Sequence, residues 1–179
     1  MKPIFIKFII FILLFPIICC MAGIYGFLHD QISYSVSPEY FTHLKFSQFN
    51  IQNNLHNRIG AGLVGVLATW WMGLITGIII IPIGLIIPKW QNYFKIMLKS
   101  FIYISLTALL TGIIALIYGL DKYNINNIPR FNIPEGVNNI VNFCVVANMH
   151  TFSYIGGIIG IVIGIIYLIV MNMKIRQMI

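Results

Sequence analysis

The stretch from Ile59 to Ile87 reads IGAGLVGVLATWWMGLITGIIIIPIGLII and holds no charged residue. A helix needs about 20 mainly apolar residues to cross the ~30 Å hydrocarbon core of a bilayer, because each residue rises about 1.5 Å. This stretch exceeds that length, and an open strand would leave its backbone polar groups unpaired in lipid. It therefore predicts a membrane-spanning helix.

Three further apolar stretches lie on either side of it. The spans are expected at about 8–28, 59–87, 100–120 and 151–171, joined by loops at about 29–58 and 121–150. Only 8% of the residues are charged, against about 25% in soluble domains, which excludes a water-soluble enzyme and a disordered protein. We expect an all-α polytopic membrane protein, a single domain over 1–179 that forms a four-transmembrane-helix bundle with short interfacial helices on the outer side.

The basic residues predict the orientation of this bundle. The positions that no nearby acid balances flank the spans on one side of the membrane: Lys2, Lys7, Lys89, Lys95, Lys99, Lys174 and Arg176. In the two long loops, four basic and four acidic residues cancel. Because basic residues stay in the cytoplasm, we expect a multi-pass protein of the bacterial inner membrane with both termini cytoplasmic. The net charge of +7 thus reflects topology and gives no indication of nucleic acid as a partner.

Small residues recur every four positions in two of the spans. They are Ala61, Gly65, Thr69, Gly73 and Gly77 in the second span, and Gly156, Gly160 and Gly164 in the fourth. Such ladders let helix backbones approach closely in lipid, so we expect a compact bundle with these two helices at its centre. Trp70 and Trp71 lie in mid-span, away from the interfacial belt, and are expected to fill space inside the bundle unless one of them faces lipid.

Each outer loop contains a helix-start pattern. Ser37 precedes Pro38 and Glu39, which suits an N-cap followed by a proline in the first turn. The sequence Asn132-Ile133-Pro134-Glu135 has a similar helix-start pattern, with a proline followed by a glutamate. We therefore expect a short interfacial helix from each loop.

The candidate functional residues lie at the outer ends of the spans. His29 ends the first span and His150 begins the fourth, so the two imidazoles are expected at similar depth. One reading is a structural cap, in which His29 and Asp30 bind backbone groups at helix ends. A second is a divalent metal site drawing on His29, Asp30, Glu39 and His150, whose side chains suit zinc. A third is proton or substrate handling by the same residues. No catalytic residue and no cofactor is predicted.

Several short segments carry a resemblance. They are His29-Asp30-Gln31, Glu39-Tyr40-Phe41-Thr42, Ala68-Thr69-Trp70-Trp71-x-Gly73 and Met149-His150-x-x-Ser153-Tyr154-x-Gly156-Gly157. Together they resemble an uncharacterised family of small bacterial four-helix integral membrane proteins. The resemblance implies an integral membrane protein and no particular activity.

Few polar residues lie inside the spans, which favours a non-enzymatic role. We expect a protein that supports or assembles a partner in the lipid bilayer, either another membrane protein or a second copy of itself. The alternative is a small transporter or metal-dependent membrane enzyme that uses the His29, Asp30, Glu39 and His150 cluster.

Overall fold

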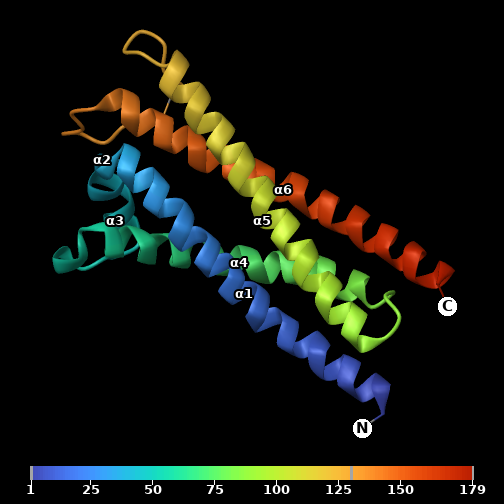
Figure 1. Ribbon diagram of the computed structural model, residues 1–179. Helices are drawn as coiled ribbons and strands as arrows, with labels where there is room; N and C mark the ends of the chain where they lie inside the picture. Colours follow the sequence, from blue (N-terminus) through green and yellow to red (C-terminus); the bar gives the residue numbers. More distant parts are fainter. Residues whose placement is uncertain (1, 130, 179) are drawn as a thin grey trace.

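The computed structural model describes residues 2–129 and 131–178. Its long helices are α1 (Pro3–Val36), α4 (Arg58–Gly84), α5 (Trp90–Lys122) and α6 (Ile140–Gln177), and the described residues contain no β-strand (Figure 1). All four helices are long enough and apolar enough to cross a membrane. The predicted all-helical fold with four long apolar helices is therefore confirmed, and a multi-pass membrane protein is indicated.

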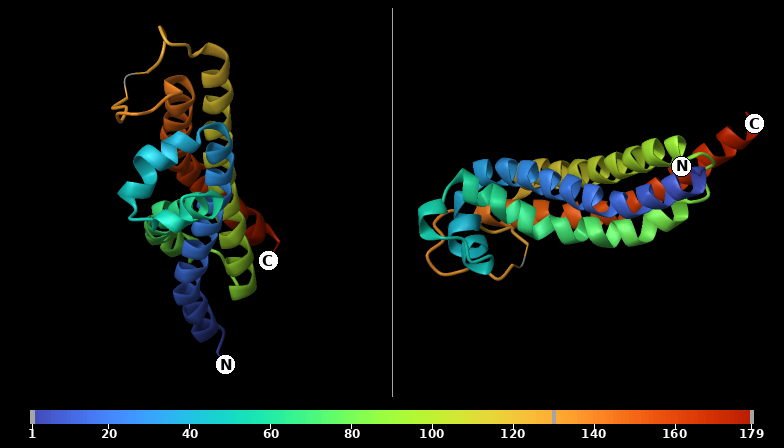
Figure 2. Two further views of the ribbon diagram at one scale, coloured as in Figure 1. Left: turned by 90° about the vertical axis from the view of Figure 1, so that its left-hand side faces the viewer. Right: turned by 90° about the horizontal axis from the view of Figure 1, so that it is seen from below.

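The short segments gather at one end of the bundle, which we call the cap end. They are α2 (Pro38–Tyr40), the π-helical turn η1 (Phe41–Lys45), α3 (Phe46–Gln48) and the 3₁₀ turn η2 (Asn53–Leu55). The loop between α5 and α6 lies at the same end, and both chain termini lie at the opposite end (Figure 2).

The long helices associate as two pairs. α1 packs along α4, and α5 packs along α6, whereas α4 and α6 touch each other only weakly. The two pairs meet mainly through α1 and α5. The expectation that the second and fourth long helices form the centre of the bundle is therefore wrong, because each of them uses its small residues on its own partner.

The small residues of α4 are turned toward α1. The backbones of Gly65 and Gly26 touch, so that a Cβ on either would overlap the other. Thr69 Oγ1 donates a hydrogen bond to the carbonyl of Ala22 at 2.7 Å, and a Cβ at Gly73 would lie 2.8 Å from the Ala22 Cβ. Close backbone approach of this kind is what holds helices together in lipid. The two remaining ladder positions, Ala61 and Gly77, are buried as well.

The ladder of α6 is turned toward α5 in the same way. A Cβ at Gly156 would overlap the side chain of Thr111. A Cβ at Gly160 would lie 2.9 Å from the Ile104 Cα, and one at Gly164 would lie 2.8 Å from Ser100 Oγ. These glycines therefore set the distance between α5 and α6.

The two mid-span tryptophans lie on the outside of the bundle. Trp70 is 46% exposed and Trp71 is 43% exposed. The expectation that they fill space inside the bundle is wrong, because the face of α4 that meets α1 is occupied by glycine and threonine, and the indoles are left on the remaining surface.

The first predicted cap helix is present and the second is absent. Ser37 Oγ accepts a hydrogen bond from the Tyr40 N–H at 3.3 Å, as expected of an N-cap. In the second loop no helix begins at Pro134, because Gly136 adopts a left-handed backbone with φ of 83°. Helix α6 begins instead at Ile140, with the Asn139 side chain as its N-cap, and continues without a break to the other end of the bundle.

Candidate functional site

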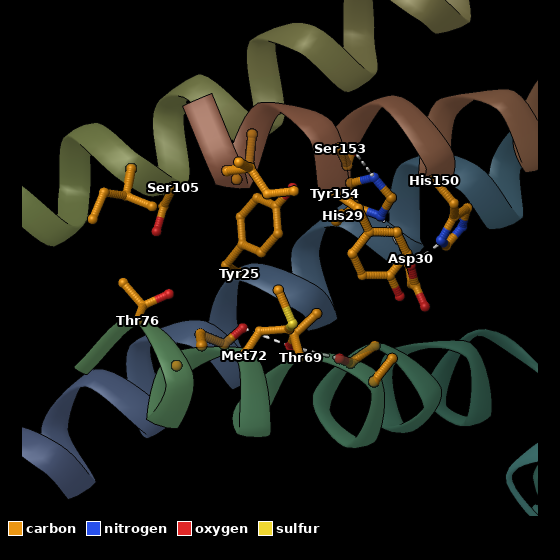
Figure 3. Close-up of a pocket in the computed structure, with 18 of the residues that line it drawn as sticks. Tyr25, His29, Asp30, Thr69, Met72, Thr76, Ser105, His150, Ser153 and Tyr154 are labelled. Atoms are coloured by element: carbon orange, nitrogen blue, oxygen red, sulfur yellow. Dashed lines mark hydrogen bonds and ion pairs between the residues drawn. The ribbon is translucent and has the colours of Figure 1, made fainter. Parts of the chain in front are cut away.

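Three of the four candidate residues converge at the cap end (Figure 3). His29 and Asp30 come from the last turns of α1, and His150 comes from α6. His29 Nδ1 lies 3.0 Å from Asp30 Oδ1, and His150 Nε2 lies 3.6 Å from the same oxygen. One ligand atom from each residue lies within 4.8 Å of the others. The side chains therefore form a compact group with the ligand types of a transition-metal site.

The group is buried, and part of it has no partner. Asp30 is 2% exposed and His29 is 4% exposed. Asp30 Oδ2 and His150 Nε2 have no hydrogen-bond partner among the described residues. A buried polar atom left unpaired costs free energy, so native proteins seldom keep two of them together without a function. The arrangement leaves two atoms free to bind something.

The fixed orientation of His29 comes from both of its ring nitrogens. Nδ1 faces Asp30, and Nε2 lies 2.9 Å from Ser153 Oγ. The His29 and Asp30 side chains bond to other side chains, so the backbone partners that a structural cap predicts are not found among the described residues. Ser153 was not predicted as part of the site, although it follows His150 by three positions and so shares its helix face.

Glu39 does not join this group. Its carboxylate accepts hydrogen bonds from the N–H and the side-chain amide of Asn138, at 3.1 and 3.0 Å, and from the Asn139 N–H at 2.8 Å. These bonds hold the pKa of Glu39 below its ordinary value. Glu39 therefore ties α2 to the start of α6 and has no free oxygen directed at the histidines.

Glu39→Gln is expected to destabilise the cap in a pH-dependent way. Because the folded-state pKa is lowered, the carboxylate stabilises the fold above its ordinary pKa of about 4.5, and this contribution disappears as the pH falls through the lower folded value. The melting temperature of the variant in detergent should lie below that of the natural chain at pH 7 and approach it near pH 3. Glu135→Gln, in the loop between α5 and α6, is the control and should match the natural chain at both pH values. A difference that is the same at pH 3 and pH 7 would contradict the ionic role.

A cavity of about 100 Å³ runs from the buried group into the bundle and is open at its mouth. All four long helices line it, and most of its wall is apolar. Tyr25 projects into the same region, and its hydroxyl has no hydrogen-bond partner among the described residues (Figure 3). The buried group therefore forms the polar end of an otherwise apolar cavity.

Lys45 of η1 lines the cavity at the cap end. Its Nζ donates to Gln48 Oε1 at 3.0 Å and lies 5.5 Å from the centre of the Tyr40 ring. Burial lowers the pKa of Lys45, and the negative charge of Asp30 opposes that shift. Lys45 adds a positive charge to the polar end of the cavity, and the sequence offered no spacing that would have placed it there.

Comparisons of this chain with known protein families, with curated proteins and with solved structures find no match. The resemblance that its short segments suggest therefore stays a prediction.

Proposed function

We propose that this chain is a four-span inner-membrane protein, with both termini in the cytoplasm and the cap end outside, that binds a divalent transition-metal ion of the zinc type. His29, Asp30 and His150 are the ligands. The observation that carries the proposal is the convergence of two imidazoles and one carboxylate, in which His150 Nε2 and the second carboxylate oxygen of Asp30, Oδ2, are buried without partners among the described residues. This geometry favours the metal-dependent alternative over a role in assembly.

The distances suit zinc. Zinc–ligand bonds of about 2.0–2.2 Å in a tetrahedral site place the ligand atoms about 3.4 Å apart. The separations around Asp30 Oδ1 are 3.0 Å to His29 and 3.6 Å to His150. If the metal binds His29 Nδ1, the other ring nitrogen, Nε2, carries the proton and donates a hydrogen bond to Ser153 Oγ. Metal-bound histidines ordinarily donate their second N–H to a hydrogen-bond acceptor in this way.

Three protein ligands leave one coordination position open. Sites of this kind hold a water molecule or a substrate atom in the fourth position, and the metal polarises or deprotonates what it binds there. In this chain the ligands border the cavity, so the open position is available to a molecule lying in it. We therefore assign a catalytic or transport site to the group and not a closed structural one.

Metal binding is tested by titrating the purified, chelator-treated protein with zinc and measuring the metal by elemental analysis. We expect one zinc per chain, and an affinity at least ~100-fold lower in His29→Ala and in His150→Ala, since even outer-shell changes cost about 10–100-fold. His43→Ala, an exposed cap histidine, is the control and should bind as the natural chain does. A chain that takes up no zinc, or variants that bind it undiminished, would reject the proposal.

The proposed topology is tested with alkaline phosphatase fusions. Fusions after Asn53 and Asn127, which lie at the cap end, should be active because they reach the outer side. Fusions after Asn92 and at the C-terminus should be inactive. The opposite pattern would place the cap in the cytoplasm.

A second candidate function follows from the hydrogen bonds of Ser153. Asp30, His29 and Ser153 form a relay with separations of 3.0 and 2.9 Å, which is the arrangement of an activated serine nucleophile. In that chemistry Ser153 Oγ attacks an acyl carbonyl, its proton passes to His29 Nε2, and His29 then protonates the leaving alcohol. A fluorophosphonate probe should label Ser153 if this function holds. Labelling that is absent, or that persists in Ser153→Ala, rejects it without affecting the zinc measurement.

A further inference from the structure

Gly157 on α6 differs from the glycines that bring helices together. A Cβ at the neighbouring Gly156 would overlap Thr111, whereas a Cβ at Gly157 would meet no atom of the described chain within 4 Å. Glycine inside a helix costs about 1 kcal/mol relative to alanine, and packing does not account for it at this position. Gly157 lines the cavity, so the missing side chain keeps cavity space open.

The cavity lies between the two helix pairs. α4 and α6 contribute most of the residues that line it, and these two helices touch each other only weakly. Tyr154 and Ile158 of α6 line the cavity and are 42% and 64% exposed. In the proposed topology these exposed side chains face hydrocarbon, so the molecule that enters the cavity comes from the bilayer.

The length of the cavity corresponds to one leaflet. Its lining on α6 runs from His150 to Ile161, which is about 16 Å along a helix and about half of the ~30 Å hydrocarbon core. The buried ionisable groups His29 and Asp30 lie at the cap end of this length, together with the half-buried His150 and with Lys45. The cavity therefore has the shape and polarity of a site for an extended molecule with one polar end.

We infer that the cavity binds a single-chain carboxylate of the outer leaflet, a long-chain fatty acid, with its chain between α4 and α6 and its carboxylate at the cap end. The Lys45 ammonium supplies positive charge there, and the unpartnered Tyr25 hydroxyl supplies a hydrogen-bond donor. The open position of the zinc proposed above supplies a third contact, and to that extent the inference rests on the proposed function. One chain suits a cavity of about 100 Å³.

The test uses the full-length protein in phosphatidylcholine vesicles that contain a diazirine-bearing palmitate. After irradiation we expect labelled peptides from the facing walls of the cavity, around Met72 on α4 and Tyr154 on α6. Gly157→Leu places a side chain in the open space and should lower this labelling at least tenfold. Val162→Phe adds bulk to an exposed position of the same helix that does not line the cavity, and it should leave the labelling unchanged.

Zinc titration of Gly157→Leu separates this inference from the proposed function. Unchanged zinc affinity together with lost labelling supports a fatty acid in the cavity of an intact protein. Labelling that is equal in Gly157→Leu and the natural chain overturns the inference, whatever the zinc result. Labelling of the same peptides by a diazirine-bearing phosphatidylcholine, and not by the palmitate, also overturns it.

Discussion

Gly65→Leu is expected to separate α1 from α4 and to prevent recovery of a folded, monodisperse protein. The added Cβ would overlap the carbonyl group of Gly26, and a helix backbone cannot move aside as a side chain can. Overpacking costs about 1–3 kcal/mol where side chains can adjust, and we expect at least the upper value here. In a chain of 179 residues that corresponds to a fall in melting temperature of roughly 10 °C. The melting temperature is measured in detergent, and gel filtration shows whether the variant still elutes as a single peak.

Gly157→Leu provides the matched control for this prediction. The substitution is the same and also lies in the middle of a long helix, but the new Cβ meets no atom of the described chain within 4 Å. Its melting temperature should equal or exceed that of the natural chain, since leucine is the better helix former. Equal destabilisation by the two variants would show that helix contact at Gly65 is not what holds α1 and α4 together.

Local sequence predicted the long helices well and their partners poorly. An uncharged run such as 59–87 has only one stable backbone form in lipid, so its helix follows from composition alone. The ladder containing Gly65 shows that α4 has a packing face, but small residues pack against any other small-residue face. Gly65 meets Gly26 of α1 and not a glycine of α6, because the whole set of contacts between the helices decides the pairing. The weak contact between α4 and α6 could not be predicted for the same reason.

The sequence predicted the site residues whose positions follow from where they lie along the long helices, His29 and His150. The expected spans end at His29 and begin at His150, which predicted that the two residues lie at the same level of the bundle. The helices themselves extend beyond both residues, to Val36 in α1 and back to Ile140 in α6. Glu39 lies apart from the histidines because its carboxylate accepts hydrogen bonds from the N–H groups of Asn138 and Asn139, which no spacing in the sequence predicts. Lys45 reaches the cavity through the fold of the cap, which no periodicity in the sequence encodes.

Asp30→Asn is expected to affect the metal-free and metal-bound protein in opposite directions. In the metal-free chain the buried carboxylate has one partner, His29, and an oxygen without any among the described residues. Asparagine keeps an oxygen to accept from His29 and removes a carboxylate from a buried position, where an ionised group is costly. We therefore expect the melting temperature without metal to stay the same or to rise by about 2–4 °C, the shift for roughly 1 kcal/mol.

With zinc present the order should reverse. A ligand at 100 times its dissociation constant stabilises the protein that binds it by about 2.7 kcal/mol, and an amide is a far weaker zinc ligand than a carboxylate. The natural chain should gain this stabilisation and Asp30→Asn should lose most of it. With zinc the natural chain should therefore have the higher melting temperature, whereas with chelator Asp30→Asn should equal or exceed it. Ser33→Ala, which removes a neighbouring buried hydroxyl that donates to the His29 carbonyl at 3.0 Å, should shift both conditions equally. If Asp30→Asn behaved like Ser33→Ala, the carboxylate would have a structural role only. If the order of the two melting temperatures reverses between chelator and zinc, the carboxylate stabilises the protein by binding the metal.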